Sequence, residues 1–90
     1  MISVVVPAYN EEDSIEKTIK SLTDVAAKSD QVGFEIIVVD DGSTDLTADR
    51  AESAGVSVIR KPQNIGYGHS LKIGIKAAKY DTIVIIDADG

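Results

Sequence analysis

The chain has 90 residues, enough for one small domain, and its 43% hydrophobic content argues against wholesale disorder. Its formal net charge of −6 argues against nonspecific nucleic-acid binding, and a phosphate ligand would need a cation between itself and the protein. The absence of cysteine excludes disulfides and thiolate metal sites and fits a cytoplasmic protein. No stretch approaches the roughly 20 apolar residues of a membrane span, and the first residues read as a strand, not a signal peptide.

The first half of the chain predicts two strands with a helix between them. An apolar run from Ile2 to Val6 stops at Pro7, and a second runs from Phe34 to Val39. Between them Asn10 is placed to cap a helix. Its apolar stripe consists of Ile15, Ile19, Leu22 and Ala26.

The second half repeats the alternation. Ser43, Thr44 or Asp45 is expected to cap a second helix that ends at Gly55, and Val56 to Ile59 reads as a short strand. Lys61 to Gly68 is a loop. A third helix carries Leu71, Ile75 and Ala78 on one face, and the apolar strand Thr82 to Ile86 is expected to be covered on both faces.

The order β-α-β-α-β-α-β predicts an α/β fold, a three-layer, Rossmann-like parallel sheet with helices on both faces and the strand order 3-2-1-4. Ligands of such sheets bind beyond the carboxyl ends of the strands. Those ends fall here at Pro7 to Glu12, Asp40 to Asp45 and Asp87 to Gly90, all polar.

Paired aspartates mark two of these ends. One aspartate after the second strand fits a turn, but Asp40 and Asp41 repel each other, so the second one favours a ligand. A carboxylate there can accept a ring N–H from uracil or guanine. On this basis Asp41→Asn is expected to weaken nucleotide binding with little cost in stability, because a turn tolerates Asn.

Asp87 and Asp89 follow the fourth strand with one residue between them, so their side chains can point to the same side. Two such carboxylates suit a hard cation, Mg²⁺ or Mn²⁺, that bridges to a diphosphate. The plain alternative is a strand that ends in solvated aspartates.

The glycine-containing loop from Asn64 to Gly68 opens the third helix, where a phosphate can bind. It lacks the third glycine of a dinucleotide fingerprint, since that position is Leu71, and no P-loop pattern occurs. Lys72 is placed to reach a phosphate, although a solvated lysine is the default. His69 is assigned a structural role, and Tyr9 fits either a base-stacking or a covering role.

These motifs together resemble the family 2 glycosyltransferases of GT-A fold, over essentially the whole chain. The residues that carry the resemblance are Val4-Val5-Val6-Pro7-Ala8-Tyr9-Asn10-Glu11, Ile37-Val38-Val39-Asp40-Asp41-Gly42-Ser43-Thr44-Asp45, Asn64-x-Gly66 and Ile85-Ile86-Asp87-Ala88-Asp89-Gly90. The stretch from Gly66 to Lys72 and the Asp-Ala-Asp-Gly motif look most like the branch that moves a hexose to a polyprenyl (dolichyl-type) phosphate.

The resemblance implies roles for individual residues. The nucleotide-binding residues would be Pro7, Tyr9, Glu11, Val39, Asp41, Lys72 and Asp87, with Asp41 taking the ring N–H and Asp40 supporting the turn. The metal ligands would be Asp87 and Asp89, with Asp89 the more direct. Lys72 stands where many relatives carry an arginine, so it lacks the bidentate fork.

The resemblance also implies an activity: transfer of a sugar, with inversion, from a UDP- or GDP-linked donor to an acceptor such as a polyprenyl phosphate. Residues 1–90 would be the N-terminal nucleotide-sugar-binding part, cut at the Asp-x-Asp motif. The catalytic base and acceptor pocket would then lie downstream, so the chain alone would bind nucleotide at most. The fourth strand would have an unpaired edge that favours self-association.

Three alternatives remain. A phosphatase of the haloacid dehalogenase type would use Asp87 as nucleophile and Asp89 as general acid/base, but its motif normally opens the domain. A nucleotidylyltransferase would need a glycine-rich, basic loop after the first strand, which Pro7 to Asp13 lacks. A non-catalytic nucleotide-binding module is the third.

Overall fold

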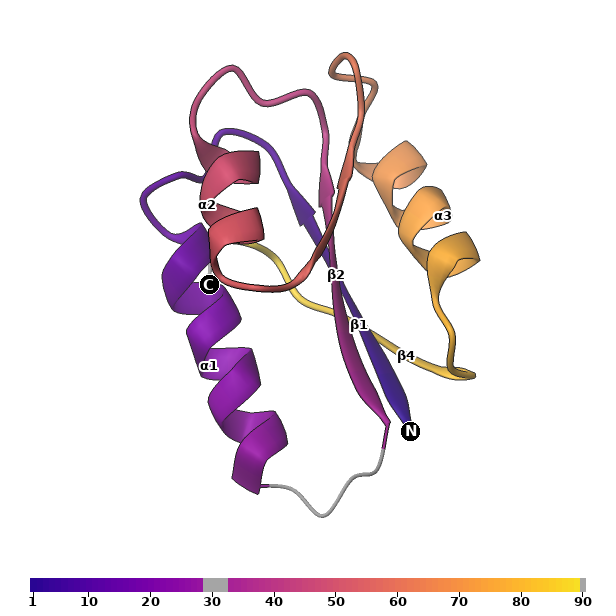
Figure 1. The fold of residues 1–90 in the computed structure, drawn as a ribbon. Coiled ribbons are helices and arrows are strands. Elements are labelled where there is room, and N and C mark those ends of the chain that lie inside the picture. The colour runs from indigo at the N-terminus through magenta and orange to yellow at the C-terminus, as the bar shows by residue number, and fades with distance from the viewer. Residues whose placement is uncertain (29–32, 90) are drawn as a thin grey trace.

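A computed structural model describes residues 1–28 and 33–89 and shows a parallel sheet between two layers of helices (Figure 1). The elements in chain order are β1 (Ile2–Ala8), α1 (Ile15–Lys28), β2 (Phe34–Asp40), α2 (Thr47–Ser53), β3 (Ser57–Arg60), α3 (Tyr67–Ala77) and β4 (Thr82–Ile85). No described helix is long and apolar enough to cross a bilayer.

The sheet has the order β3-β2-β1-β4, and every pairing is parallel, which confirms the predicted α/β class and strand order. Ile2 of β1 aligns with Phe34 of β2 and with Thr82 of β4. The carboxyl ends of β1 and β2 therefore lie side by side, as the sequence predicts for a site at this end of the sheet.

Alternate residues of β1 fill separate cores on the two faces. Val4 and Val6 pack with Ile15 and Ile19 of α1 in one core. Val5 lies in the other core, together with Ile37 and Val39 of β2 and the partly buried Ile73 of α3. Figure 1 shows α1 and α2 on one side of the sheet and α3 on the other. The predicted three-layer arrangement is confirmed.

Pro7 lies inside β1, although the sequence predicts that the strand stops before it. Ala8 accepts a hydrogen bond from Asp41 on the β2 side, and Val5 accepts one from Ile86 on the β4 side. By alternation Pro7 faces β4, where the ladder ends at the pair of Val5 with Ile85. Pro7 is tolerated because no sheet hydrogen bond requires its missing N–H.

The apolar face predicted for α3 is only partly buried, because Leu71 is half-buried and Ala78 packs against the core while Ile75 is not covered. The buried residues of α3 are Ser70 and Gly74, and Ile75 is 44% exposed. A Cβ on Gly74 would lie 2.3 Å from Cγ1 of Val5, so α3 approaches the sheet through its smallest residue. Close backbone approach, not apolar spacing, selects the face of this helix.

Asn10 does not cap α1, which also differs from the prediction. It has a positive φ of 52°, its N–H donates to Oγ of Ser43, and its Oδ1 accepts from the N–H of Thr44. The helix itself begins at Ile15. Asn10 therefore joins the loops that follow β1 and β2 at the carboxyl end of the sheet.

The strand β4 is less covered than the sequence predicts. Val84 is 38% exposed and Ile85 is 40% exposed. Within the described residues β4 pairs only with β1, so its outer edge carries no strand. Its apolar composition is that of a covered strand.

Candidate nucleotide and metal site

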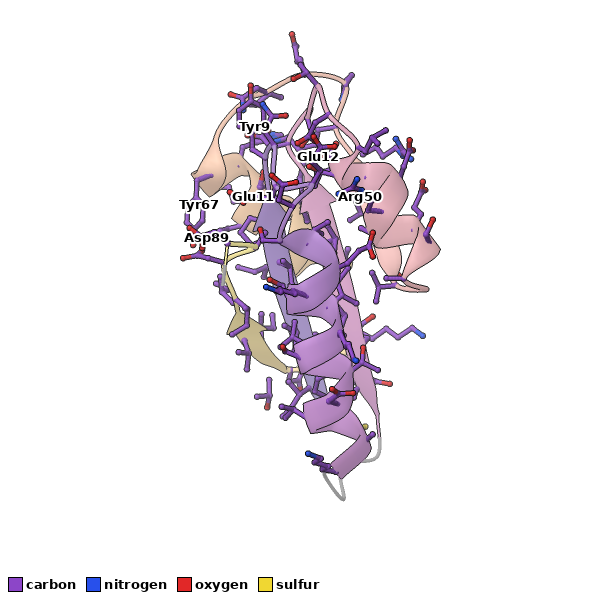
Figure 2. All side chains as sticks on the ribbon, turned by 90° about the vertical axis from the view of Figure 1, so that its left-hand side faces the viewer. Tyr9, Glu11, Glu12, Arg50, Tyr67 and Asp89 are labelled. Carbon is purple, nitrogen blue, oxygen red and sulfur yellow. The ribbon has the colours of Figure 1, made fainter. Side chains whose placement is uncertain are left out.

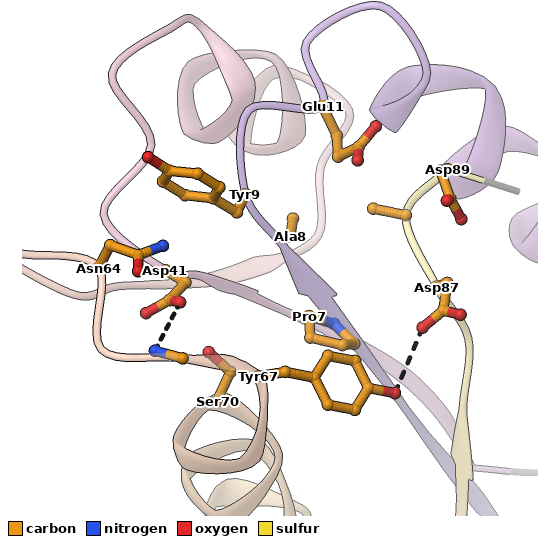
Figure 3. Close-up of a pocket in the computed structure, with 12 residues that line it drawn as sticks. Pro7, Ala8, Tyr9, Glu11, Asp41, Asn64, Tyr67, Ser70, Asp87 and Asp89 are labelled. Atoms are coloured by element: carbon orange, nitrogen blue, oxygen red, sulfur yellow. Dashed lines mark hydrogen bonds between the residues drawn. The ribbon is translucent and has the colours of Figure 1, made fainter.

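A cleft of about 410 Å³ lies at the carboxyl ends of β1, β2 and β4 (Figure 3). Figure 2 shows Tyr9, Glu11, Tyr67 and Asp89 gathered at this end of the molecule. The lining residues come from four separate segments of the chain: Pro7, Ala8, Tyr9, Glu11, Asp41, Asn64, Gly66, Tyr67, Ser70, Asp87, Ala88 and Asp89. The sheet thus assembles in one place the polar strand ends that the sequence singles out.

Asp41 is buried at the cleft wall, where only 5% of the residue is exposed. Its Oδ1 accepts from the N–H of Ile65 at 2.9 Å and from Nζ of Lys61 at 2.6 Å. Its Oδ2 accepts from the N–H of Gly66 at 2.9 Å. Asp41 therefore fixes the loop between β3 and α3 against the end of β2.

These donors decide the charge of Asp41. Burial alone would raise the pKa of this carboxyl. The hydrogen bonds from Ile65, Lys61 and Gly66 and the positive charge of Lys61 outweigh burial and hold the pKa below its ordinary value of 3.8. Asp41 is consequently a carboxylate at neutral pH, able to accept but not to donate a hydrogen bond.

Asp87 and Asp89 lie on the other wall of the cleft, on either side of the buried Ala88 (Figure 3). The carbonyl of Ala88 accepts from Oγ of Ser14 at 3.0 Å and from Oγ1 of Thr18 at 2.9 Å. Two hydroxyls of the α1 region thus hold the backbone between the two aspartates. These hydrogen bonds fix the backbone positions from which the side chains of Asp87 and Asp89 extend.

Tyr67 connects the two walls. Its hydroxyl donates to Oδ1 of Asp87 at 3.3 Å. Partial burial and then the negative charge of Asp87 raise the pKa of the Tyr67 phenol, so it remains a protonated donor.

Glu11 is placed by hydrogen bonds with the first residue of α2 and with Ser14 just before α1. Its N–H donates to Oγ1 of Thr47 at 2.8 Å, and its Oε2 accepts from Oγ of Ser14 at 3.1 Å. The N–H of Glu12 donates in turn to Asp45. The loop from Tyr9 to Asp13 is thereby held in position although it contains no regular structure.

The acidic side chains of the cleft fit a cation that is coordinated mainly by the oxygens of a bound phosphate and by water. No group of three potential metal-ligating side chains occurs in residues 1–28 and 33–89. Asp87 and Asp89 supply two carboxylates on the cleft wall. Mg²⁺ is commonly held by one or two carboxylates together with phosphate oxygens and waters, which matches this donor set.

The family model for glycosyl transferase family 2 matches residues 3–90. The chain belongs to this family. The match spans all four motifs that carry the resemblance and does not favour the phosphatase alternative.

Curated relatives extend the match along almost the whole chain. A dolichyl-phosphate beta-glucosyltransferase from Dictyostelium discoideum is 34% identical over 99% of this chain and 31% of its own length. An undecaprenyl-phosphate 4-deoxy-4-formamido-L-arabinose transferase from Pseudomonas fluorescens is 36% identical over 98% of this chain and 27% of its own. The chain thus spans about a third of these family members.

A solved family neighbour has the same arrangement of elements. The glucosyl-3-phosphoglycerate synthase of Mycobacterium tuberculosis, in complex with Mn²⁺, UDP and phosphoglyceric acid, superposes with a TM-score of 0.83. It is 38% identical, and the match covers 98% of this chain and 32% of that one. This likeness confirms the GT-A fold that the sequence predicts.

Six of the predicted site residues line the cleft: Pro7, Tyr9, Glu11, Asp41, Asp87 and Asp89. Two others do not. Val39 is fully buried in the core under α3, and Lys72 is exposed outside the cleft. Asp40 is buried and accepts a hydrogen bond from the N–H of Ser43, consistent with its expected support of the turn.

Lys61 is a residue of the site region that the sequence does not single out. It reads there as the start of a polar loop, yet its side chain is buried against Asp41 and Ser70. The structure also changes the expectation for Asp41→Asn. The substitution would leave a buried ammonium without its counter-charge, so it must affect stability as well as binding.

Proposed function

We propose that the protein carrying this chain transfers a sugar from a nucleoside diphosphate sugar to an acceptor, with a divalent cation at Asp87 and Asp89. One observation carries the proposal. The cleft holds a buried carboxylate suited to a base on one wall and two carboxylates suited to a cation and diphosphate on the other. The family membership of the chain agrees with this arrangement.

The nucleoside would lie between Tyr9, Pro7 and Asp41. Tyr9 is 44% exposed at the mouth of the cleft, where its ring offers a flat apolar face to a base or ribose. Asp41 would accept the ring N–H of the base, and Glu11 lies along the path from the base toward Asp89 (Figure 3). Val39 and Lys72 would take part only through the backbone or a change in side-chain position.

The diphosphate would meet the wall formed by Asp87 and Asp89. A bound Mg²⁺ or Mn²⁺ supplies charge that neutralises the diphosphate leaving group. Asp87 and Asp89 would hold that cation, with Asp89 as the more direct ligand. Ser14 and Thr18 would keep both carboxylates in place through the carbonyl of Ala88. Tyr67 would orient Asp87.

For the acceptor we propose a polyprenyl phosphate and transfer with inversion at a membrane face on the cytoplasmic side. The dolichyl- and undecaprenyl-phosphate transferases among the relatives support this choice. The group that deprotonates the acceptor is expected from residues that follow this chain.

Removal of Asp89 tests the function. The protein that carries this chain is assayed with UDP- and GDP-hexoses and a short polyprenyl phosphate, in Mn²⁺ and in chelator. Asp89→Ala should lower turnover by on the order of 100-fold or more, because the charge stabilisation that a bound cation supplies is worth several kcal/mol. The matched control is Asp24→Ala, an exposed aspartate of α1 outside the cleft, which should leave turnover unchanged.

Full activity of Asp89→Ala in chelator would refute the metal role. Transfer to phosphoglycerate instead of the lipid phosphate would refute the acceptor alone. Hydrolysis of simple phosphate esters that depends on Asp89, with no sugar transfer by the unmodified protein, would establish the phosphatase alternative.

A further inference from the structure

Lys61 is a buried cation that the proposed function does not use. Only 6% of the residue is exposed, and its Nζ lies 2.6 Å from Oδ1 of Asp41 and 3.2 Å from Oγ of Ser70. Burial of an ammonium costs several kcal/mol unless it is paired and hydrogen-bonded. Asp41 and Ser70 offset this cost, and the pairing places a fixed donor on the carboxylate that borders the cleft.

The hydrogen bonds of Asp41 leave little capacity for a ligand. A carboxylate offers about four acceptor positions, two on each oxygen. The N–H of Ile65 and Nζ of Lys61 fill both positions on Oδ1, and the N–H of Gly66 fills one on Oδ2. One position remains, on Oδ2, the oxygen joined to Gly66 by the dashed line in Figure 3.

A single vacant acceptor position distinguishes between bases. Guanine presents a ring N–H and an exocyclic amine side by side, and a carboxylate satisfies both only when each oxygen has a free position. Uracil presents one ring N–H between two carbonyl oxygens. Guanine would leave one of its two donors without a partner on Asp41, and an unpaired buried donor lowers affinity by about 5- to 150-fold.

We infer that Lys61 is a positioning residue that limits Asp41 to one hydrogen bond with the ligand and thereby selects uracil over guanine. The inference rests on the proposed function. It specifies the donor substrate as a uridine diphosphate sugar.

The surroundings of Asp41 agree with this choice. Asn64 lines the same cleft, and its side-chain carboxamide offers both a donor and an acceptor, which is the complement of the alternating carbonyl and ring N–H groups of uracil. Figure 3 shows Asn64 and Tyr9 close to Asp41, with Asp87 and Asp89 on the opposite wall. The base end and the diphosphate end of the cleft are thus separate.

Three nucleotides test the selection without any substitution. UDP, GDP and the diphosphate of 3-methyluridine, which lacks the ring N–H, are titrated calorimetrically into the protein that carries this chain, each with Mn²⁺. UDP should bind about fivefold or more tightly than either of the others, since that is the smallest cost of one unmatched buried polar group. Equal binding of UDP and GDP, or of UDP and its methylated form, would overturn the inference while the proposed function stands. No binding of any nucleotide would overturn the proposed function.

Two substitutions test Lys61 itself. Lys61→Met removes the donor that holds Oδ1 in place, so the carboxylate of Asp41 can turn toward the ligand and the ratio of GDP to UDP dissociation constants should fall several-fold. Lys61→Gln keeps an uncharged donor and should retain the preference. Lys76→Met makes the same change on the exposed face of α3 and is the matched control, with an unchanged ratio.

Circular dichroism establishes that each variant is folded. If Lys61→Met is folded and keeps the full preference for UDP, the inference is overturned. If Lys61→Met does not fold, Lys61→Ala, which also removes the donor, decides, and a full preference for UDP in the folded variant overturns the inference.

Discussion

Asp41 combines a structural and a ligand-facing position in one side chain. Its carboxylate holds Lys61 and the N–H groups of Ile65 and Gly66, and it also borders the cleft. Charge-assisted hydrogen bonds of this kind are stronger than neutral ones. The loop between β3 and α3 is therefore held in place by the same residue that would accept the ring N–H of the base.

Substitution of Asp41 should consequently affect folding and binding together. Asp41→Asn keeps an acceptor for the loop but leaves Lys61 as an uncompensated buried charge, so the free energy of unfolding should fall by about 3 kcal/mol. Adding Lys61→Met should restore part of this loss, because the double variant no longer buries a lone cation. Urea unfolding of the two single variants and the double variant measures the coupling. Strict additivity would contradict a direct interaction.

The stability of the protein at acid pH should also depend on the carboxylate of Asp41. Because the fold lowers the pKa of Asp41, its ionisation contributes stability that is complete above the ordinary value of 3.8 and is lost as the pH falls through the lower folded value. The Asp41→Asn variant lacks this contribution. Its stability should depend less steeply on pH below 3.8 than that of the unmodified protein.

Among individual residues, the sequence predicts the aspartates that line the cleft but does not predict that Lys61 is buried against one of them. Asp41, Asp87 and Asp89 follow apolar strands, and the ends of parallel strands converge by geometry, so the site is predictable from them. Lys61 follows a short strand in a polar loop, where a lysine is ordinarily solvated. Its burial depends on the tertiary contact with Asp41 and Ser70, which no local pattern encodes.

Strands and helices of this chain differ in how well the sequence predicts them. The strands are continuous apolar runs in a sheet covered on both faces, so their existence, order and direction follow from pattern and handedness. The buried face of α3 does not. Ser70 and Gly74 lie inward because small residues permit close approach to the sheet, a steric effect that apolar spacing cannot show.

Two glycines of α3 provide a matched test of this packing. Alanine is intrinsically better than glycine in a helix by about 1 kcal/mol. Gly74→Ala should nevertheless destabilise the protein by about 1–2 kcal/mol, because the new methyl group would overlap Cγ1 of Val5. Gly68→Ala, whose added Cβ meets no atom within 4 Å beyond its chain neighbours and the backbone of its own helix, should be neutral or stabilising by up to about 1 kcal/mol. Thermal unfolding of both variants compares them, and a stabilising Gly74→Ala would show that α3 does not approach the sheet so closely.

For the whole molecule, the parallel order β3-β2-β1-β4 leaves two strands at the edges of the described sheet. The edge strand β3 is short and has half-buried or exposed residues. The edge strand β4 is apolar throughout apart from Thr82. The chain also spans only about a third of the length of the relatives described above. The composition of β4 therefore suits a strand that is paired on both sides, which the described residues do not provide.

The 90-residue chain, prepared alone, should for this reason self-associate through β4. An unpaired apolar edge offers N–H and C=O groups to another chain, and a small domain gains relatively much stability from such contacts. Sedimentation from micromolar to millimolar concentration should show a dimer or larger species. Val84→Lys places a charge on the exposed face of β4 and should shift the equilibrium toward monomer, whereas Val25→Lys, on an exposed site of α1, should not. A chain that stays monomeric throughout, with the amides of β4 exchanging freely, would contradict association through this strand.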